Sequence, residues 1–455
     1  MQSNEASELL ELAKTALFYA KKNSAQEASV IISCDQGESL SWREKDVEEL
    51  NREGNFSFAV KVMNDKKAYG MASTSDRSKA AIEQAVDAAI AIARESEGDE
   101  ANGLPDKNQY QRQEKIAEFN RDFCCATQDF GNFATVDGMK NLARELEAQA
   151  EQFDPRINNI EASVYNNRNL RLYADTNEFF YQHTTSSCGY GLSLLATDNS
   201  SHNQQSGSYF KSQTNPELLP TPRTIAEKAS LRALNALNPL PIKNAKYPVL
   251  FVPEVASSLI SHLLSALSGT MQYRKLSFLN DALTSQVLPE FLSLKENPYQ
   301  KNSMFATPCD DDGLPPAESE IIKNGIVERY LLSLYSARRL NLAPTGNAGG
   351  VVNLHFSTPN ENLPSREEIL KNAGDALMIT SLMGQGVNLL TGDYSRGASG
   401  FLIRNGEIVQ AVEGLTVAGN LRDILKSISA IADDADTNRN AQIPSLLING
   451  ITIAN

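Results

Sequence analysis

The chain has 455 residues, of which 41% are hydrophobic and 22% are charged, and its formal net charge is −14 at pH 7. This length allows two or three domains with buried cores, whereas the acidic balance argues against nucleic-acid binding, because Lys and Arg supply most of the affinity for phosphate. The sequence has no apolar run of membrane-spanning length, no signal-peptide pattern and only five unpatterned cysteines, so we expect a cytoplasmic protein without a membrane partner.

Residues 1–115 predict a first α+β unit. Apolar residues at helical spacing predict a helix over 5–22, and an Ala-rich segment predicts another over 77–95. Runs rich in alternating apolar residues predict three strands, at residues 27–34, 38–50 and 55–74. A hairpin turn is expected at 64–67, within the last of these, and the polar segment 96–115 is typical of a linker or surface loop.

Residues 116–240 predict a second α+β unit with long antiparallel strands. Helices are expected at 137–152 and 221–237. Thr- and Ser-rich segments predict strands near 158–166, 169–175 and 178–196. The Asp175–Asn177 turn separates the last two strands, and 198–220 is a polar connection between the strands and the second helix.

Residues 241–455 predict a third, β-rich unit. The apolar strand 247–252 ends at Pro253, which is well suited to begin a helix over 254–268. Asn-Gly pairs predict three hairpins, at Asn324-Gly325, Asn405-Gly406 and Asn449-Gly450. A helix is expected at 421–431. The predicted fold is therefore α+β, with N-terminal α/β sandwich-like units followed by a C-terminal, largely antiparallel, curved or barrel-like β domain with a few helices.

The segment 383–401, MGQGVNLLTGDYSRGASGF, carries five glycines around Asp393, Tyr394, Ser395 and Arg396. Polar residues in such a loop are candidates for lining a functional site, because binding residues concentrate on loops of rigid scaffolds. The alternative is a tight turn in which Arg396 pairs with Asp393. Ser395 lacks the G-x-S-x-G elbow and a nearby His, so serine catalysis is disfavoured.

Four ordered blocks carry a resemblance to a known family. They are GDYSRGASGF with MGQGV before it, residues 248–269 with YRKLSFL after them, LYSAR at 334–338 with PTGNAGG at 344–350, and TVAGNLRD at 416–423. Together they resemble the TldD/PmbA family, "modulator of DNA gyrase" in older usage, and within it the PmbA (TldE) branch. The resemblance runs from about Leu9 to the C-terminus and is strongest after Tyr247.

The resemblance implies a zinc-dependent peptidase built from two related subunits. The TldD-type subunit carries a His-Glu-x-x-x-His helix and a later Cys as metal ligands, and the PmbA-type subunit is its partner without them. The complex is associated with maturation of peptide antibiotics and degradation of small antitoxins. The fold implied for the C-terminal unit agrees with the curved or barrel-like sheet expected from the Asn-Gly hairpins.

This chain departs from the metalloprotease pattern at every ligand. Glu254 stands at the general-base position, but Pro253 and Ser258 replace the two histidines, and neither is a useful zinc ligand. The cysteines are at positions 34, 124, 125, 188 and 309, and none follows Cys309 to stand where the family's later Cys ligand would fall. We therefore expect no metal in this chain and zinc in a TldD-type partner.

The remaining candidates have plain structural alternatives. His183, His202, His262 and His355 are scattered without ligand spacing. His262 lies eight residues after Glu254, so the two could face one cleft; alternatively, His262 packs at a helix–helix contact. Tyr273 and Arg274 could hold a peptide carboxylate or carbonyl, or form an ion pair with neighbouring acids. The acidic runs 310–312 and 433–436 are expected to be solvated loops.

The favoured function is a non-catalytic subunit that pairs with a TldD-like metalloprotease, or with itself, and helps hold an extended peptide substrate. Its candidate cleft residues are Glu254, His262, Tyr273, Arg274, Asp393, Tyr394, Ser395 and Arg396. One alternative is a hydrolase active on its own through Glu254, with an unrecognised metal or nucleophile. A weaker alternative is a regulatory binding protein of the DNA gyrase system.

Overall fold

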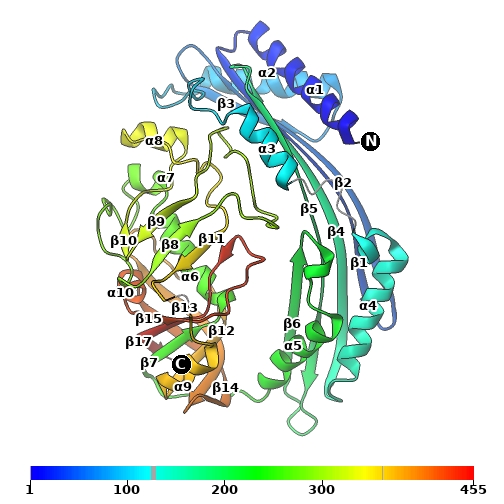
Figure 1. Ribbon diagram of the computed structural model, residues 1–455, viewed down its shortest axis with the longest axis vertical. Coiled ribbons are helices and arrows are strands. Elements are labelled where there is room, and N and C mark those ends of the chain that lie inside the picture. Colours follow the sequence, from blue (N-terminus) through cyan, green and yellow to red (C-terminus); the bar gives the residue numbers. More distant parts are fainter. Residues whose placement is uncertain (1, 124–129, 361, 455) are drawn as a thin grey trace.

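The computed structural model describes residues 2–123, 130–360 and 362–454 (Figure 1). Its first part is one six-stranded antiparallel sheet, in the order β3-β2-β1-β4-β5-β6. The strands are β1 (Glu27–Arg43), β2 (Asp46–Met63), β3 (Tyr69–Thr74), β4 (Ile157–Asp175), β5 (Phe180–Thr197) and β6 (Gln204–Gln213). Because β1 pairs with β4, the boundary predicted at residue 115 lies between two sets of strands that share this sheet.

Two pairs of helices cover the two ends of this long sheet (Figure 1). The first pair is α1 (Gln2–Lys22) and α2 (Lys79–Glu95), and the second pair is α4 (Val136–Glu151) and α5 (Pro222–Asn235). Alternate residues of β1 such as Val30 and Ile32 are buried under the first pair, as the period of two in a strand requires. The short elements α3 (Gln113–Phe123), η1 (Gly131–Ala134) and η2 (Pro216–Leu218) lie between them in sequence.

The C-terminal part contains a five-stranded barrel. Its strands follow the order β14-β13-β12-β7-β17, and β14 pairs again with β17, which closes the ring. They are β7 (Ala245–Phe251), β12 (Ala376–Met383), β13 (Asp393–Arg404), β14 (Glu407–Asn420) and β17 (Leu446–Ala454). The short strand β15 (Ile428–Ile431) attaches to β17. The predicted α+β fold with a largely antiparallel, barrel-like C-terminal domain is therefore confirmed.

Among the described residues, a second sheet and five helices complete this part. The sheet has the order β10-β9-β8-β11-β16, with β8 (Ser293–Glu296), β9 (Ser319–Lys323), β10 (Ile326–Val327), β11 (Leu354–Ser357) and β16 (Ala441–Gln442). The helices are α6 (Pro253–Ala266), α7 (Gly269–Tyr273), α8 (Leu334–Leu340), α9 (Arg366–Ala373) and α10 (Leu421–Lys426). Within the described residues, no helix has the length and apolar character that crossing a membrane demands.

Several local predictions need correction. The polar connection at 198–220 contains the strand β6, because Ser and Gln alternate with small or aromatic residues that pair with β5. The predicted helix at 421–431 ends at Lys426, and the next residues form β15 on the edge of β17. The Asn449-Gly450 pair makes no hairpin but sits at a register shift inside β17. The other two Asn-Gly hairpins and the turn at 64–67 are confirmed.

Charged and polar contacts join the long sheet to the C-terminal part. Arg171 on β4 pairs with Asp311 at 2.7 Å, and Lys211 on β6 pairs with Asp436 at 2.5 Å. Asp310 is only 5% exposed and accepts hydrogen bonds from the backbone of residues 312, 314 and 348. The two acidic runs are thus not freely solvated as expected, because their carboxylates are used to fix loops and to hold the two parts together.

Candidate functional site

Helix α6 begins where the sequence predicts. The strand β7 ends at Phe251, Val252 occupies the N-cap without a side-chain cap, and Pro253 takes the first helical turn, where its missing N–H costs nothing. One face of α6, including Val255, Leu259 and Leu263, is buried in the core. A second, polar face carries Glu254, Ser258 and His262 at intervals of four residues, so these side chains lie one above another.

The glycine-rich segment folds back on the start of β13. The amide of Ser395 donates to the carbonyl of Gly386 at 2.7 Å, and a Cβ at Gly386 would lie 2.0 Å from the Ser395 carbonyl oxygen. Gly384 has φ +79°, a left-handed conformation that favours glycine. The glycines therefore allow the backbone to approach itself closely and place Tyr394 and Arg396 toward α6.

The structure brings four of these residues together from two distant segments. Arg396 donates from Nη1 to the Ser258 hydroxyl at 2.9 Å and from Nε to the Gly384 carbonyl at 3.1 Å. The rings of His262 and Tyr394 meet edge to face, with centroids 6.2 Å apart. Asp393 instead accepts from Thr391 at 2.6 Å, so the alternative pairing of Arg396 with Asp393 is not formed.

Burial and the charge of Arg396 shift the pKa values of Tyr394 and His262. Tyr394 is 2% exposed, and burial raises its pKa to about 12 against the opposing effect of Arg396. Burial also lowers the pKa of His262, and the charge of Arg396 adds to this effect. At neutral pH the tyrosine is therefore protonated and the histidine is neutral. His262 Nε2 has no hydrogen-bond partner among the described residues, and Tyr394 Oη forms no well-oriented hydrogen bond there, although the Arg396 guanidinium lies near enough to lower its pKa.

Glu254 faces the long sheet and is held in an ion pair. Its carboxylate lies 2.7 Å from Arg232 on α5, and Arg232 also donates to the Ser208 carbonyl and covers the ring of Tyr209 at 5.0 Å. Burial alone would raise the pKa of Glu254, but the hydrogen bond and charge of Arg232 outweigh it, and the pKa lies below its ordinary value. A carboxylate held in this way is a weak proton acceptor at neutral pH.

The other candidates lie elsewhere. Tyr273 contacts Tyr335 of α8 edge to face at 5.7 Å and receives a hydrogen bond from Arg274 at 3.0 Å. Asp393 and Ser395 point to solvent at the start of β13. Of the eight predicted cleft residues, the structure thus joins His262, Tyr394 and Arg396 directly, with Glu254 on the same helix face. Sequence reasoning missed Arg232, because no motif marks it.

The residues present do not fit a zinc site. Pro253 offers no donor, and the hydroxyl of Ser258 already receives the Arg396 hydrogen bond. Across residues 2–123, 130–360 and 362–454, no group of three or more His, Cys, Asp or Glu is placed to hold a metal ion. Cys34, Cys188 and Cys309 are buried free thiols, and Cys124 and Cys125 fall outside the described residues.

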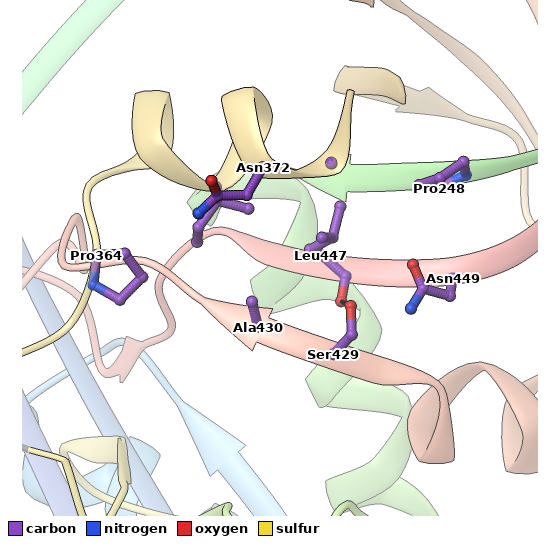
Figure 2. Close-up of a pocket in the computed structure, with 9 residues that line it drawn as sticks. Pro248, Pro364, Asn372, Ser429, Ala430, Leu447 and Asn449 are labelled. Atoms are coloured by element: carbon purple, nitrogen blue, oxygen red, sulfur yellow. Dashed lines mark hydrogen bonds between the residues drawn. The ribbon is translucent and has the colours of Figure 1, made fainter. Parts of the chain in front are cut away.

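A separate concavity of about 380 Å³ lies between α9 and the strands β15 and β17 (Figure 2). Its nine lining residues carry no charge, and they include Pro248, Asn372, Ser429 and Asn449. It shares no residue with the polar face of α6. The cavity is therefore separate from the candidate site and has no charged side chain in its lining.

Three domain models of one family match the chain in order. They describe PmbA/TldA metallopeptidase domain 1 at residues 28–93, the central domain at 131–237 and the C-terminal domain at 244–455. The chain belongs to the PmbA/TldD metallopeptidase family. Metalloprotease PmbA of Escherichia coli O157:H7 is 35% identical over 98% of this chain and 96% of its own length, and the Metalloprotease PmbA homolog of Haemophilus influenzae is 34% identical with the same coverage.

Solved structures agree with this assignment. A protein of Bacteroides thetaiotaomicron named as a modulator of DNA gyrase is 25% identical, with a TM-score of 0.88 over 98% of this chain and 99% of its own. TldE from Thermococcus kodakarensis is 18% identical, with a TM-score of 0.81 over 98% of this chain and all of its own, and shares the fold. Metalloprotease TldD homologs of Buchnera aphidicola align over 37% of this chain at 23% identity.

Proposed function

We propose that this chain is the PmbA (TldE)-type subunit of a cytoplasmic two-subunit metalloprotease, and that it supplies no zinc ligand. Its partner is a TldD-type subunit that carries the metal, and its substrates are extended peptides or unfolded small proteins. The observation that carries the proposal is the Arg396–Ser258 hydrogen bond. It places a fixed positive charge on the helix face where the resemblance expects a metal ligand.

The state of Glu254 supports the same proposal. A general base needs a pKa close to the working pH and a free lone pair, whereas Arg232 binds this carboxylate at 2.7 Å and keeps its pKa low. This disfavours the alternative in which the chain is a hydrolase through Glu254. Instead, Glu254 links α6 to α5 and thus joins the C-terminal part to the long sheet.

An extended substrate has open sheet edges available to it. The strands β3 and β6 lie at the two ends of the long sheet order, and edge strands expose unpaired N–H and C=O groups. A peptide that adds as a further strand is held by its backbone, so it is bound with broad sequence tolerance. Of the two edge strands, β6 adjoins α6, because Arg232 bonds both Ser208 of β6 and Glu254.

The test compares the chain alone with the chain co-expressed with a TldD-type protein. We expect the pair to co-purify as a heterodimer by light scattering, and only the pair to cleave fluorescein-labelled casein in a chelator-sensitive reaction. We expect the chain alone to contain far less than one equivalent of zinc by elemental analysis. Stoichiometric zinc in the chain alone, together with chelator-sensitive cleavage by it, would favour the hydrolase alternative.

A further inference from the structure

Four hydrogen-bonding side chains converge between α6 and the start of β13. We propose that Ser258, His262, Tyr394 and Arg396 form a binding site for a carboxylate group of the peptide substrate. The inference rests on the proposed function and adds a substrate feature to it. The proposed site binds a charged group of the peptide, whereas an edge strand would bind the peptide backbone.

The first argument is the uncompensated charge of Arg396. Both of its hydrogen bonds go to neutral oxygens, those of Ser258 and Gly384. In the part of the chain that the structure describes, no carboxylate lies within 4.0 Å of its guanidinium. The acid on the same helix face, Glu254, stands one turn before Ser258 and is bound by Arg232. A carboxylate ligand would therefore meet no competing acid here.

The second argument is independent and concerns the buried hydroxyl of Tyr394. Tyr394 is only 2% exposed, and its hydroxyl lies near the Arg396 guanidinium but forms no well-oriented hydrogen bond with a described group. His262 Nε2 is equally shut off from water and without a partner. An unmade buried hydrogen bond destabilises the folded chain, so two such atoms beside a guanidinium are typical of a site that a ligand completes.

The chemistry of the donors selects the ligand class. The tyrosine is protonated at neutral pH, so its hydroxyl donates, and serine and arginine donate as well. A guanidinium binds carboxylates in a planar, two-pronged geometry, whereas a cation would be repelled by Arg396. Every peptide with a free C-terminus carries such a carboxylate, and Asp or Glu side chains are the second source.

The segment 383–386 adjoins the site. This segment is exposed, with Met383 at 51% exposure, and its Gly384 carbonyl holds Arg396. A carboxylate oxygen can take the place of that carbonyl as an acceptor, and a charged acceptor binds more strongly than a neutral one. In the proposed site, ligand binding therefore exchanges one hydrogen bond of Arg396 for a stronger one.

The experiment measures binding of fluorescein-labelled decapeptides to the full chain by anisotropy. Three peptides share one uncharged sequence: the first has a free C-terminus, the second is amidated, and the third is amidated but contains one Glu. We expect the free carboxylate to bind at least about tenfold more tightly than the amidated form. Tight binding of the third peptide alone would assign the site to acidic side chains. Equal binding of all three, or binding of none, would overturn the proposal.

Two variants link this preference to the site. Tyr394→Phe and Arg396→Gln should each reduce the preference for the carboxylate about tenfold or more, whereas Arg404→Gln on the same strand and the buried Tyr190→Phe should leave it unchanged. Tyr394→Phe should also keep its melting temperature, because it removes an unpaired hydroxyl. An unchanged preference in both site variants would contradict the assignment. Casein cleavage by the mixed pair tests the proposed function separately.

Discussion

Arg396 and Ser258, 138 residues apart in the chain, are joined by a hydrogen bond of 2.9 Å between Nη1 and Oγ. The contact ties the start of β13 to the polar face of α6. It is made possible by the glycines at 384 and 386, which let the preceding segment fold over β13. The family resemblance places a metal ligand at Ser258, and the structure places a guanidinium beside it.

Arg396→Ala should therefore reduce cleavage by the reconstituted pair much more than it affects folding. The variant loses two hydrogen bonds at a half-buried side chain, which costs about 1–2 kcal/mol of unfolding free energy, while the pair loses the positive charge of the candidate site. The measurement is casein cleavage alongside urea unfolding. Arg404→Ala is the matched control, since that arginine forms an exposed pair with Asp375. Normal assembly and normal cleavage by the Arg396 variant would make the glycine-rich loop purely structural.

Glu254→Gln separates the proposed function from the hydrolase alternative. The side chains of Glu254 and Arg232 are 35% and 47% exposed. Loss of this ion pair should therefore cost less than about 1 kcal/mol of unfolding free energy. We expect the mixed pair to retain its cleavage rate within about twofold. Glu227→Gln, which removes an exposed pair with Arg223 on α5, controls for the charge change. A loss of cleavage of a hundredfold or more, at unchanged stability and assembly, would show that Glu254 acts as a base.

Much of the fold is predictable because its signals are local. Pro253 begins α6 as expected, since proline suits the first helical turn, and the Asn324-Gly325 and Asn405-Gly406 turns join paired strands. Asn449-Gly450 carries the same local signal but lies inside β17, where pairing with β7 overrides it. Closure of the barrel by β14 and β17 depends on contacts between distant segments, for which a single sequence gives no local sign.

The candidate site is likewise predictable only where a residue lies in a local sequence pattern. Arg396 was recognisable because its loop is dense in glycine, and Glu254 because it follows the proline of a degenerate ligand helix. Ser258 stands out in the sequence only as a replaced metal ligand, and Arg232 carries no motif. That these two residues are the partners of Arg396 and Glu254 depends on how distant elements pack. Tyr273 and Arg274 are candidates in the sequence because Arg can hold a carboxylate, but in the structure Tyr273 contacts Tyr335 of α8 and Arg274 donates to the Tyr273 hydroxyl.

The stability of the chain should decrease in acid through His183. Burial lowers the pKa of this residue to about 4, and the charge of Arg171 adds to this effect. In the unfolded chain the histidine has an ordinary pKa of about 6.5. Between about pH 6.5 and pH 4 it is therefore protonated in the unfolded state and neutral in the folded state. Unfolding free energy therefore falls as the pH falls from about 7 to 4, by at most about 3 kcal/mol from this residue.

The measurement is the difference in unfolding free energy between the native sequence and His183→Gln, followed from pH 7.5 to 4.5. Subtraction removes the contributions of other titrating groups, including Asp310, whose pKa burial raises to about 7. We expect the native sequence to lose stability relative to the variant as the pH decreases. A flat difference for His183→Gln would mean that folding does not lower the pKa of this histidine.

Gly400→Ala should test whether the close pairing of β13 with β12 is needed to place Arg396 against α6. A Cβ at Gly400 would lie 1.9 Å from the Met378 carbonyl oxygen, on the paired strand β12. Backbone cannot move away as a flexible side chain would, so we expect a loss of about 3 kcal/mol of unfolding free energy and a displaced β13. Gly54→Ala in β2 is the control, because its Cβ would meet nothing within 4 Å. If denaturant unfolding found both variants equally stable, β13 would be free to shift, and the placement of Arg396 against α6 could not depend on this strand pairing.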